Sequence, residues 1–203
     1  MAKDLTFAGG EGQTPLEDLS GLLAPVKTRQ ALNELEAKNN GKAYAKYLLF
    51  VKTPKAFNLL AAGVLCEIHQ EMFAEVWSWA GEFRKGGGKN IGVPAVKIGS
   101  ELHRLLSDWR HWEERKVPAV EIAARIHHRL VEIHPFENGN GRWARLVTNI
   151  YLHGKGFPLI EWPQDPKVIC EDFKPKYLTA LKKADQGEYA PLFELHKKYT
   201  GAG

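Results

Sequence analysis

Two helical patterns joined by one short turn, between residues 119 and 151, constrain the fold of this chain more than any other feature. The apolar residues of the first pattern recur at helical spacing, at Ala119, Ile122, Ala123, Ile126, Leu130 and Ile133. Such a stripe is typical of a helix that is buried on one side. Pro135 ends the pattern, because the residue before a proline is pushed out of the α region. A second pattern starts at Gly141 or Arg142, so the sequence predicts two packed helices around a short loop.

Helical spacing also recurs on both sides of this pair. We expect further helices over about 28–38, 43–51, 56–74 and 100–115, and two in the tail over 166–199 that are separated near Gly187. Gly41 is expected to stop the first of them, and Ser100 to cap the start of the fourth. Residues 83–99, called the flap segment here, are rich in glycine with short β-branched pieces, which favours a β-hairpin or an exposed flap. The predicted fold class is therefore mostly α, a helical bundle with one small β-hairpin flap.

The length of 203 residues suits one domain. Residues 1–20 are expected to form a flexible N-terminal arm, and residues 21–203 a single helical domain. Cys66 and Cys170 form no CxxC pair, which argues against a disulfide scaffold and favours a reducing compartment. No apolar run approaches the ~20 residues of a membrane span, and no signal-peptide core is visible. We therefore expect a cytoplasmic location.

The formal net charge of +4 is a mild excess of positive charge. It permits binding to phosphate or to an acidic protein, but it does not by itself indicate nucleic-acid binding. Direct binding to nucleic acid is therefore not expected.

Residues 134–145 carry the groups most suited to chemistry. Arg142 and Arg145 share one face of the second helix of the pair, at its positive N-terminal end, where acids are normally preferred. Two cations there make sense if an anion binds to the free N–H groups of the helix start. Gly139 and Gly141 would let the backbone approach that anion, and Asn140 can cap the helix or reach an oxygen. The alternative, weighed about evenly, is an ordinary loop whose arginines pair with surface acids.

His134 stands immediately before this turn and is the candidate general base. Its ring could take a proton from a hydroxyl that attacks a phosphorus atom. A packed or surface histidine is the competing reading. A base must also be neutral, whereas a helix C-terminus favours the imidazolium.

Two other sets of residues have weaker functional readings. His127 and His128 are expected to be satisfied core or surface residues, and no zinc-ligand spacing is present. Arg84, Lys85, Lys89 and Lys97 make the flap segment basic. It is either a solvated loop, or an edge that pins a target protein segment by adding a strand.

The sequence from His134 to Arg145 resembles the Fic motif, His-Pro-Phe-x-Asp/Glu-Gly-Asn-Gly-Arg-x-x-Arg, and agrees at eight of its nine specified positions. The resemblance extends over about 24–199 and includes Trp-Ala-Gly-x-Phe-Arg at 79–84. The surroundings of Asn138, together with residues 89–93, look like the Fic subgroup called mobile mystery protein B.

The resemblance implies a Fic-type helical bundle that moves AMP from ATP, with Mg²⁺, to a Ser, Thr or Tyr hydroxyl of a target protein. His134 would be the base and Phe136 a core anchor. Gly139, Asn140 and Gly141 would cradle the phosphates, with Arg142 on the inner phosphates and Arg145 on the terminal one. The part of the flap segment that would align the target comprises Lys89, Asn90, Ile91, Gly92 and Val93.

Asn138 departs from the motif, because Fic proteins usually hold Mg²⁺ through a carboxylate at this metal-binding position. An amide is a poorer ligand for a hard cation. Two alternatives follow: a nucleotide-binding interaction module with weak or lost catalysis, or a Doc-like protein kinase, against which Gly141 counts because Doc proteins carry Lys there. The Ser/Thr-x-x-x-Glu-Gly/Asn segment that restrains many Fic proteins is absent, which points to a separate antitoxin-like inhibitor chain.

Overall fold

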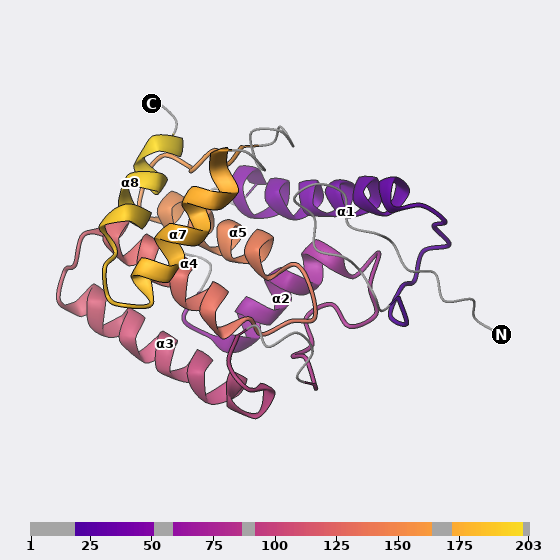
Figure 1. Ribbon diagram of the computed structural model, residues 1–203, viewed down its shortest axis with the longest axis horizontal. Helices are drawn as coiled ribbons and strands as arrows, with labels where there is room; N and C mark the ends of the chain where they lie inside the picture. The colour runs from indigo at the N-terminus through magenta and orange to yellow at the C-terminus, as the bar shows by residue number, and fades with distance from the viewer. Residues whose placement is uncertain (1–18, 51–58, 87–91, 164–171, 201–203) are drawn as a thin grey trace.

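The structure is a computed structural model that describes residues 19–50, 59–86, 92–163 and 172–200 (Figure 1). These ranges contain seven α-helices: α1 (Arg29–Tyr44), α2 (Ala62–Phe73), α3 (Ile98–Glu114), α4 (Ala119–Ile133), α5 (Asn140–Gly154), α7 (Lys174–Ala184) and α8 (Ala190–Tyr199). A π-helical turn, Ala45–Phe50, extends α1, and a 3₁₀ turn, Ala95–Lys97, precedes α3. The expected mostly α fold is confirmed.

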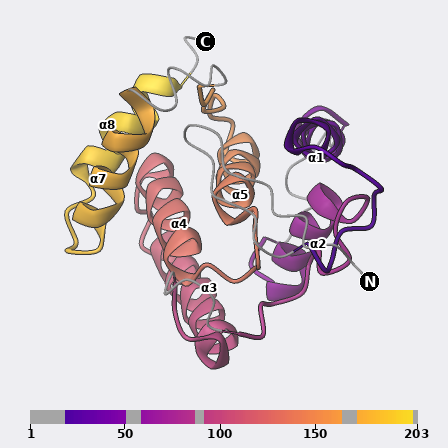
Figure 2. The same ribbon diagram turned by 45° about the vertical axis from the view of Figure 1, so that its right-hand side comes forward.

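Helix α5 lies in the middle of the bundle (Figure 2). It packs against α4 on one side and against α2 on the other, and α1 lies on α2. The α7–α8 hairpin covers α4 through α8, and α3 packs against α4. The predicted pair of helices is thus the centre of the fold.

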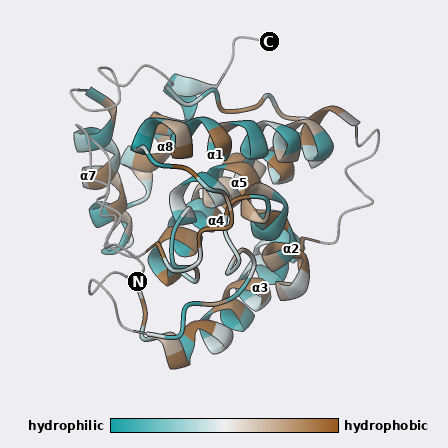
Figure 3. Ribbon diagram, turned by 90° about the vertical axis from the view of Figure 1, so that its right-hand side faces the viewer, coloured by the Kyte–Doolittle hydropathy of each residue, from teal (hydrophilic) through white to brown (hydrophobic). Residues whose placement is uncertain are grey.

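Burial explains why α5 takes this place. Ten of its fifteen residues are buried: Asn140, Trp143, Ala144, Leu146, Val147, Thr148, Asn149, Ile150, Tyr151 and Leu152. Burying each large apolar side chain contributes about 1.5–3 kcal/mol before the loss of chain entropy is counted. In Figure 3, hydrophobic and hydrophilic residues accordingly alternate along the helices.

Several helix boundaries differ from those expected. The two helices predicted before Pro54 form one continuous element, because Gly41 does not end α1. Its helix-breaking tendency, about 1 kcal/mol, is outweighed by the burial of Ala43 and Tyr47 beyond it. Helix α3 starts at Ile98, which is fully buried, and Ser100 lies inside it with its hydroxyl donating to the Lys97 carbonyl at 2.9 Å. The capping role predicted for Ser100 is therefore wrong.

The described parts of the flap segment, 83–86 and 92–99, contain no strand; they end in the 3₁₀ turn and the first residues of α3. Residues 87–91, where the hairpin was expected to turn, lie outside the described residues, as do residues 1–18 of the expected arm. The helix expected over 56–74 begins only at Ala62, after a turn at 59–61. The tail helices do separate around Gly187, whose φ is 85°.

Among the described helices, none is long and apolar enough to cross a membrane.

Candidate functional site

The turn at 134–139 begins where α4 ends. His134 adopts the left-handed conformation, with φ 51° and ψ 59°, and its N–H donates to the Leu130 carbonyl at 3.2 Å. A residue with a Cβ pays roughly 1–2 kcal/mol for this conformation. The surroundings hold it nevertheless: the Arg84 guanidinium donates through Nε to the His134 carbonyl at 2.7 Å. The backbone is therefore directed away from the axis of α4 at this one residue.

The His134 ring has a defined tautomer. Nδ1 lies 3.3 Å from the Val131 carbonyl oxygen, and because a carbonyl only accepts, Nδ1 must carry the proton. Nε2 is then left with a free lone pair. Burial lowers the pKa of His134, the Val131 hydrogen bond opposes this, and the nearby Arg84 charge lowers it further. His134 is therefore neutral near pH 7, although it caps a helix C-terminus that would favour the cation.

Asn140 holds the turn closed. Its Oδ1 accepts from the Phe136 N–H at 2.9 Å, and its Nδ2 donates to the Phe136 carbonyl at 2.8 Å. The side chain is buried. It neither caps α5 nor faces outward, so any contact of Asn140 with a phosphate would fall to its backbone N–H.

The two glycines of the turn have different roles. Gly139 has a φ of 80°, and a Cβ there would lie 2.5 Å from the ring of Phe73, so no other residue fits. A Cβ at Gly141 would meet nothing within 4 Å. Trp143 N–H, which donates to the Gly139 carbonyl at 2.9 Å, makes the first hydrogen bond within α5. The preceding N–H groups thus have no partner in the helix and can bind an anion beside the open space at Gly141.

His69 of α2 supports the turn from below. Its Nδ1 accepts from the Gly81 N–H at 3.0 Å, so Nε2 carries the proton and donates to the Asn138 carbonyl at 3.1 Å. The ring stacks on Phe136 with centroids 3.7 Å apart. Burial lowers the pKa of His69 to about 3, which keeps it neutral.

Arg142 is paired with an acid, although a buried one. Its Nη1 donates to Glu36 Oε2 at 2.7 Å, while the other oxygen of Glu36 accepts from Trp77 Nε1 at 2.7 Å. Glu36 is only 4% exposed, and the guanidinium lies over the ring of Phe73 at 4.8 Å. A phosphate that binds Arg142 must share the guanidinium with this carboxylate or displace it.

Arg145 is available in a way that Arg142 is not. Its Nε donates to the Gly141 carbonyl at 3.1 Å, and its guanidinium lies 5.9 Å from the ring of Trp162. Within the described ranges no carboxylate forms an ion pair with it. The two predicted arginines therefore differ in their partners: Arg142 pairs with a carboxylate, whereas Arg145 donates to a backbone carbonyl.

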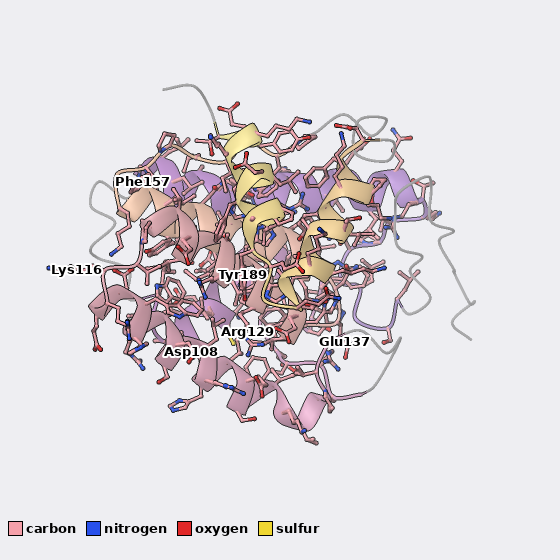
Figure 4. All side chains as sticks on the ribbon, turned by 60° about the vertical axis from the view of Figure 1, so that its left-hand side comes forward. Asp108, Lys116, Arg129, Glu137, Phe157 and Tyr189 are labelled. Carbon is pink, nitrogen blue, oxygen red and sulfur yellow. The ribbon has the colours of Figure 1, made fainter. Side chains whose placement is uncertain are left out.

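Asn138, the predicted metal-binding position, offers a neutral oxygen that is already in use. Its Oδ1 accepts from the Gly139 N–H at 2.7 Å. Neighbouring Glu137, which is labelled in Figure 4, is exposed. No group of three or more metal-binding side chains occurs in the part of the chain that the structure describes. These residues do not fit a carboxylate-held Mg²⁺ site.

The flap segment touches the turn directly. A Cβ on Gly92, whose φ is 84°, would lie 2.4 Å from the Cβ of His134, and the Val93 N–H donates to the Ile133 carbonyl at 3.4 Å. Lys89, Asn90 and Ile91 lie outside the described residues. Arg84 is buried, so it does not belong to the basic surface expected of this segment.

His127 and His128 are satisfied core residues, as expected. His127 contacts His196 at 2.9 Å and the Tyr177 hydroxyl at 3.0 Å, and His128 contacts Asp185 at 2.7 Å. Neither carries the chemistry of the turn.

Sequence reasoning missed three residues that build the site: Glu36, His69 and Arg84, the last read only as a flap cation. The signal for the first two was available, because each is a polar residue on the buried stripe of its helix. Buried polar groups need partners, and both find them at the turn or at the start of α5.

Comparison with known proteins finds similar chains by sequence and by fold. The Fic/DOC family profile matches residues 59–152, which span α2 to α5. Protein adenylyltransferase Fic of Drosophila virilis is 31% identical over 133 residues, covering 63% of this chain and 26% of that protein. Protein adenylyltransferase fic-1 of Caenorhabditis elegans is 32% identical over 202 residues, covering 97% of this chain.

This chain thus spans about a quarter of the first of these relatives and 37% of the second. Among solved structures, BepC of Bartonella tribocorum with bound AMPPNP is similar with a TM-score of 0.64 and 21% identity, covering 87% of this chain and 89% of that one. This likeness concerns the fold. The subgroup expected from the sequence stays a prediction.

Proposed function

Because this chain carries a Fic domain and belongs to the Fic/DOC family, we propose that it is a protein adenylyltransferase, which transfers AMP from ATP to a Ser, Thr or Tyr hydroxyl of a target protein. The observation that carries the proposal is the neutral His134 ring, with Nε2 free, on the turn that opens onto the start of α5. The two relatives compared above are named for this activity.

The reaction follows from these groups. The hydroxyl oxygen of the target attacks the α-phosphorus while Nε2 of His134 takes its proton. The bond from the α-phosphorus to the bridging oxygen breaks, and pyrophosphate leaves. A positioned base of this kind contributes typically ~10²–10⁴-fold in rate. The free N–H groups of α5 and the guanidinium of Arg145 would hold the phosphate charge, with Arg142 joining if Glu36 yields it.

Mg²⁺ would enter as part of the ATP substrate, held mainly by phosphate oxygens and water. The neutral Asn138 then contributes one weak ligand in place of a carboxylate. The docking of the target would fall to residues 89–93, with Gly92 against His134 and Val93 bonded to Ile133. Restraint by a separate, antitoxin-like chain and a reaction in the cytoplasm are further parts of this proposal.

Incubation with α-labelled ATP and Mg²⁺ in a cell lysate tests the proposal. We expect label on the chain itself or on lysate proteins, and its loss in His134→Ala. If neither the wild type nor His134→Ala produces any label, the proposal of an adenylyltransferase is wrong. Label that transfers from γ-labelled ATP with the wild type, and with neither His134→Ala nor the lysate alone, instead identifies a Doc-like kinase.

The second candidate, a nucleotide-binding module without turnover, is favoured by Asn138 and by the carboxylate on Arg142. It predicts ATP binding by calorimetry with no transferred label, even after Asn138→Asp.

A further inference from the structure

Arg84 is the residue that joins the flap segment to the turn. It is 8% exposed, and three backbone carbonyls accept from its guanidinium: His134 from Nε at 2.7 Å, Val93 from Nη2, and Gly86 from Nη1 at 3.4 Å. In the described part of the chain it makes no ion pair. A buried cation whose planar fork donates to carbonyls of both the flap segment and the turn fixes the two relative to one another.

The three carbonyls that accept from Arg84 lie on both sides of residues 87–91 and at the turn. Gly86 and Val93 lie on the two sides of residues 87–91, and His134 is the residue with the free ring nitrogen. Backbone hydrogen bonds repeat the connection: Arg84 N–H donates to the Pro135 carbonyl at 2.9 Å, and Val93 N–H to the Ile133 carbonyl at 3.4 Å. Both sides of the flap segment are thus attached to residues 133–135.

His134 needs such a support. It is in the left-handed conformation at the end of α4, where its carbonyl has no partner within that helix. Arg84 supplies that partner. On the other side, Gly92 packs so closely that a Cβ would overlap the Cβ of His134. The direction of the ring is therefore set from the flap segment and not by α4 alone.

From these contacts we propose that Arg84 is a positioning residue, which holds the His134 ring and both sides of the flap segment as one unit, so that a docked target hydroxyl and the base arrive in register. The role rests on the proposed adenylyl transfer. It assigns Arg84 no contact with ATP, since the side chain is buried and all three of its nitrogens donate to backbone carbonyls.

The test compares Arg84→Gln and Arg84→Lys with Arg104→Gln, which alters an exposed arginine of α3. The first readout is the ring ¹⁵N spectrum of His134, assigned with His134→Ala. We expect the wild type to show the Nδ1–H tautomer. Arg84→Gln is expected to lose this tautomer and to raise the pKa of His134, because a nearby cation is removed. Arg84→Lys keeps the charge but not the fork, so the tautomer is lost while the pKa stays low.

The second readout is kinetic. We expect kcat/KM for the target to fall by about 100-fold in both Arg84 variants, the size of effect that a small misplacement of a reacting group produces. The Kd for ATP should stay within about twofold, because ATP binding does not use Arg84. Arg104→Gln should match the wild type in every measurement.

The outcomes are separable. A folded Arg84→Gln protein with the wild-type ring spectrum, or with a wild-type rate, overturns the positioning role. A ring spectrum that responds to Arg84 in a protein without transfer activity supports the positioning role and removes the proposed function instead. If the variants do not fold, the wild type decides: the Arg84 Nε–H must exchange slowly with solvent, and fast exchange overturns the proposal.

Discussion

At the scale of single residues, His134 unites two properties that the end of a helix normally opposes. It lies where a helix dipole favours the cation, yet burial and Arg84 lower its pKa. The hydrogen bond from Nδ1 to Val131 then directs the lone pair to Nε2. A sequence can place a histidine beside a turn, but its tautomer depends on a carbonyl whose direction only the folded backbone defines.

Asn138 gives the sharpest prediction at this scale. Asn138→Asp should lower the Mg²⁺ concentration needed for half-maximal transfer by about tenfold or more, because a charged oxygen replaces a neutral one. The new carboxylate can keep the hydrogen bond from the Gly139 N–H, so the turn should persist. The measurement is the initial rate of AMP transfer against Mg²⁺ concentration. Glu137→Gln, which alters an exposed neighbour, serves as the control, and an unchanged Mg²⁺ requirement in Asn138→Asp would contradict the prediction.

At the scale of the elements, one residue of α1, Gly41, can be replaced to raise the free energy of unfolding. Gly41 lies inside the helix without a positive φ, and a Cβ there meets nothing within 4 Å. Gly41→Ala should therefore stabilise the fold by about 0.5–1 kcal/mol, because alanine loses less backbone freedom on folding. Urea denaturation measures this directly.

The matched control is Gly187→Ala. That position also has open space, but its φ of 85° is strained for any residue with a Cβ, so it should be destabilised. Stabilisation at both sites, or at neither, would show that the local backbone is not the cause.

Glu36 links α1 to α5, and its charge is expected to act on nucleotide binding. Glu36→Gln keeps an acceptor for Trp77 but removes the carboxylate that pairs with Arg142. The freed guanidinium should lower the Kd for ATP by about tenfold, equivalent to ~1.4 kcal/mol. Calorimetry with ATP is the measurement, and Glu34→Gln, an exposed change on the same helix, is the control. A Kd that stays equal or rises would mean that Arg142 does not meet the phosphates.

The apolar periodicity predicted most of the helices, because an apolar stripe marks the face that a helix buries, and this burial stabilises the helix. It failed where two tendencies compete. Gly41 favours a stop and the buried Ala43 beyond it favours continuation, and only the packed structure shows which prevails. Ser100 was predicted to cap α3 because its own residue type favours that position. The helix begins two residues earlier because Ile98 is buried, and this burial is visible only in the folded structure.

At the scale of the whole molecule, buried histidines should make the fold sensitive to acid. Burial lowers the pKa of His69 and of His196 to about 3 in the folded state, against about 6.5 in the unfolded chain. Below pH 6.5 these histidines therefore bind protons in the unfolded chain but stay neutral in the folded protein. Stability should fall as the pH drops from about 6.5 toward 3, by up to about 1.4 kcal/mol per pH unit for each histidine.

Urea denaturation between pH 7.5 and 4.5 measures this slope. His196→Gln should make it shallower, whereas His103→Gln, which alters an exposed histidine, should leave it unchanged. A free energy of unfolding that is flat over this window would show that the histidines are not buried as described.

The motif at 134–145 could be recognised from the sequence, but the contact with Phe73 that requires a glycine at 139 and not at 141 could not. The pairing of Arg142 with Glu36 could not, because 106 residues separate them. The same holds for the attachment of Arg84 to His134, which are 50 residues apart. Local patterns identify the chemical groups, whereas the partners that tune them come from the tertiary fold.

Helix α5 contributes both to the candidate site and to the core, and this limits which substitutions can change the target of such a protein. Its first turn belongs to the candidate site, while the rest of the same helix fills the core. Substitutions along it would therefore be selected against for reasons unrelated to substrate choice. A laboratory library that seeks new targets should leave this helix untouched and diversify the outer parts of the flap segment, where altered recognition need not disturb the interior.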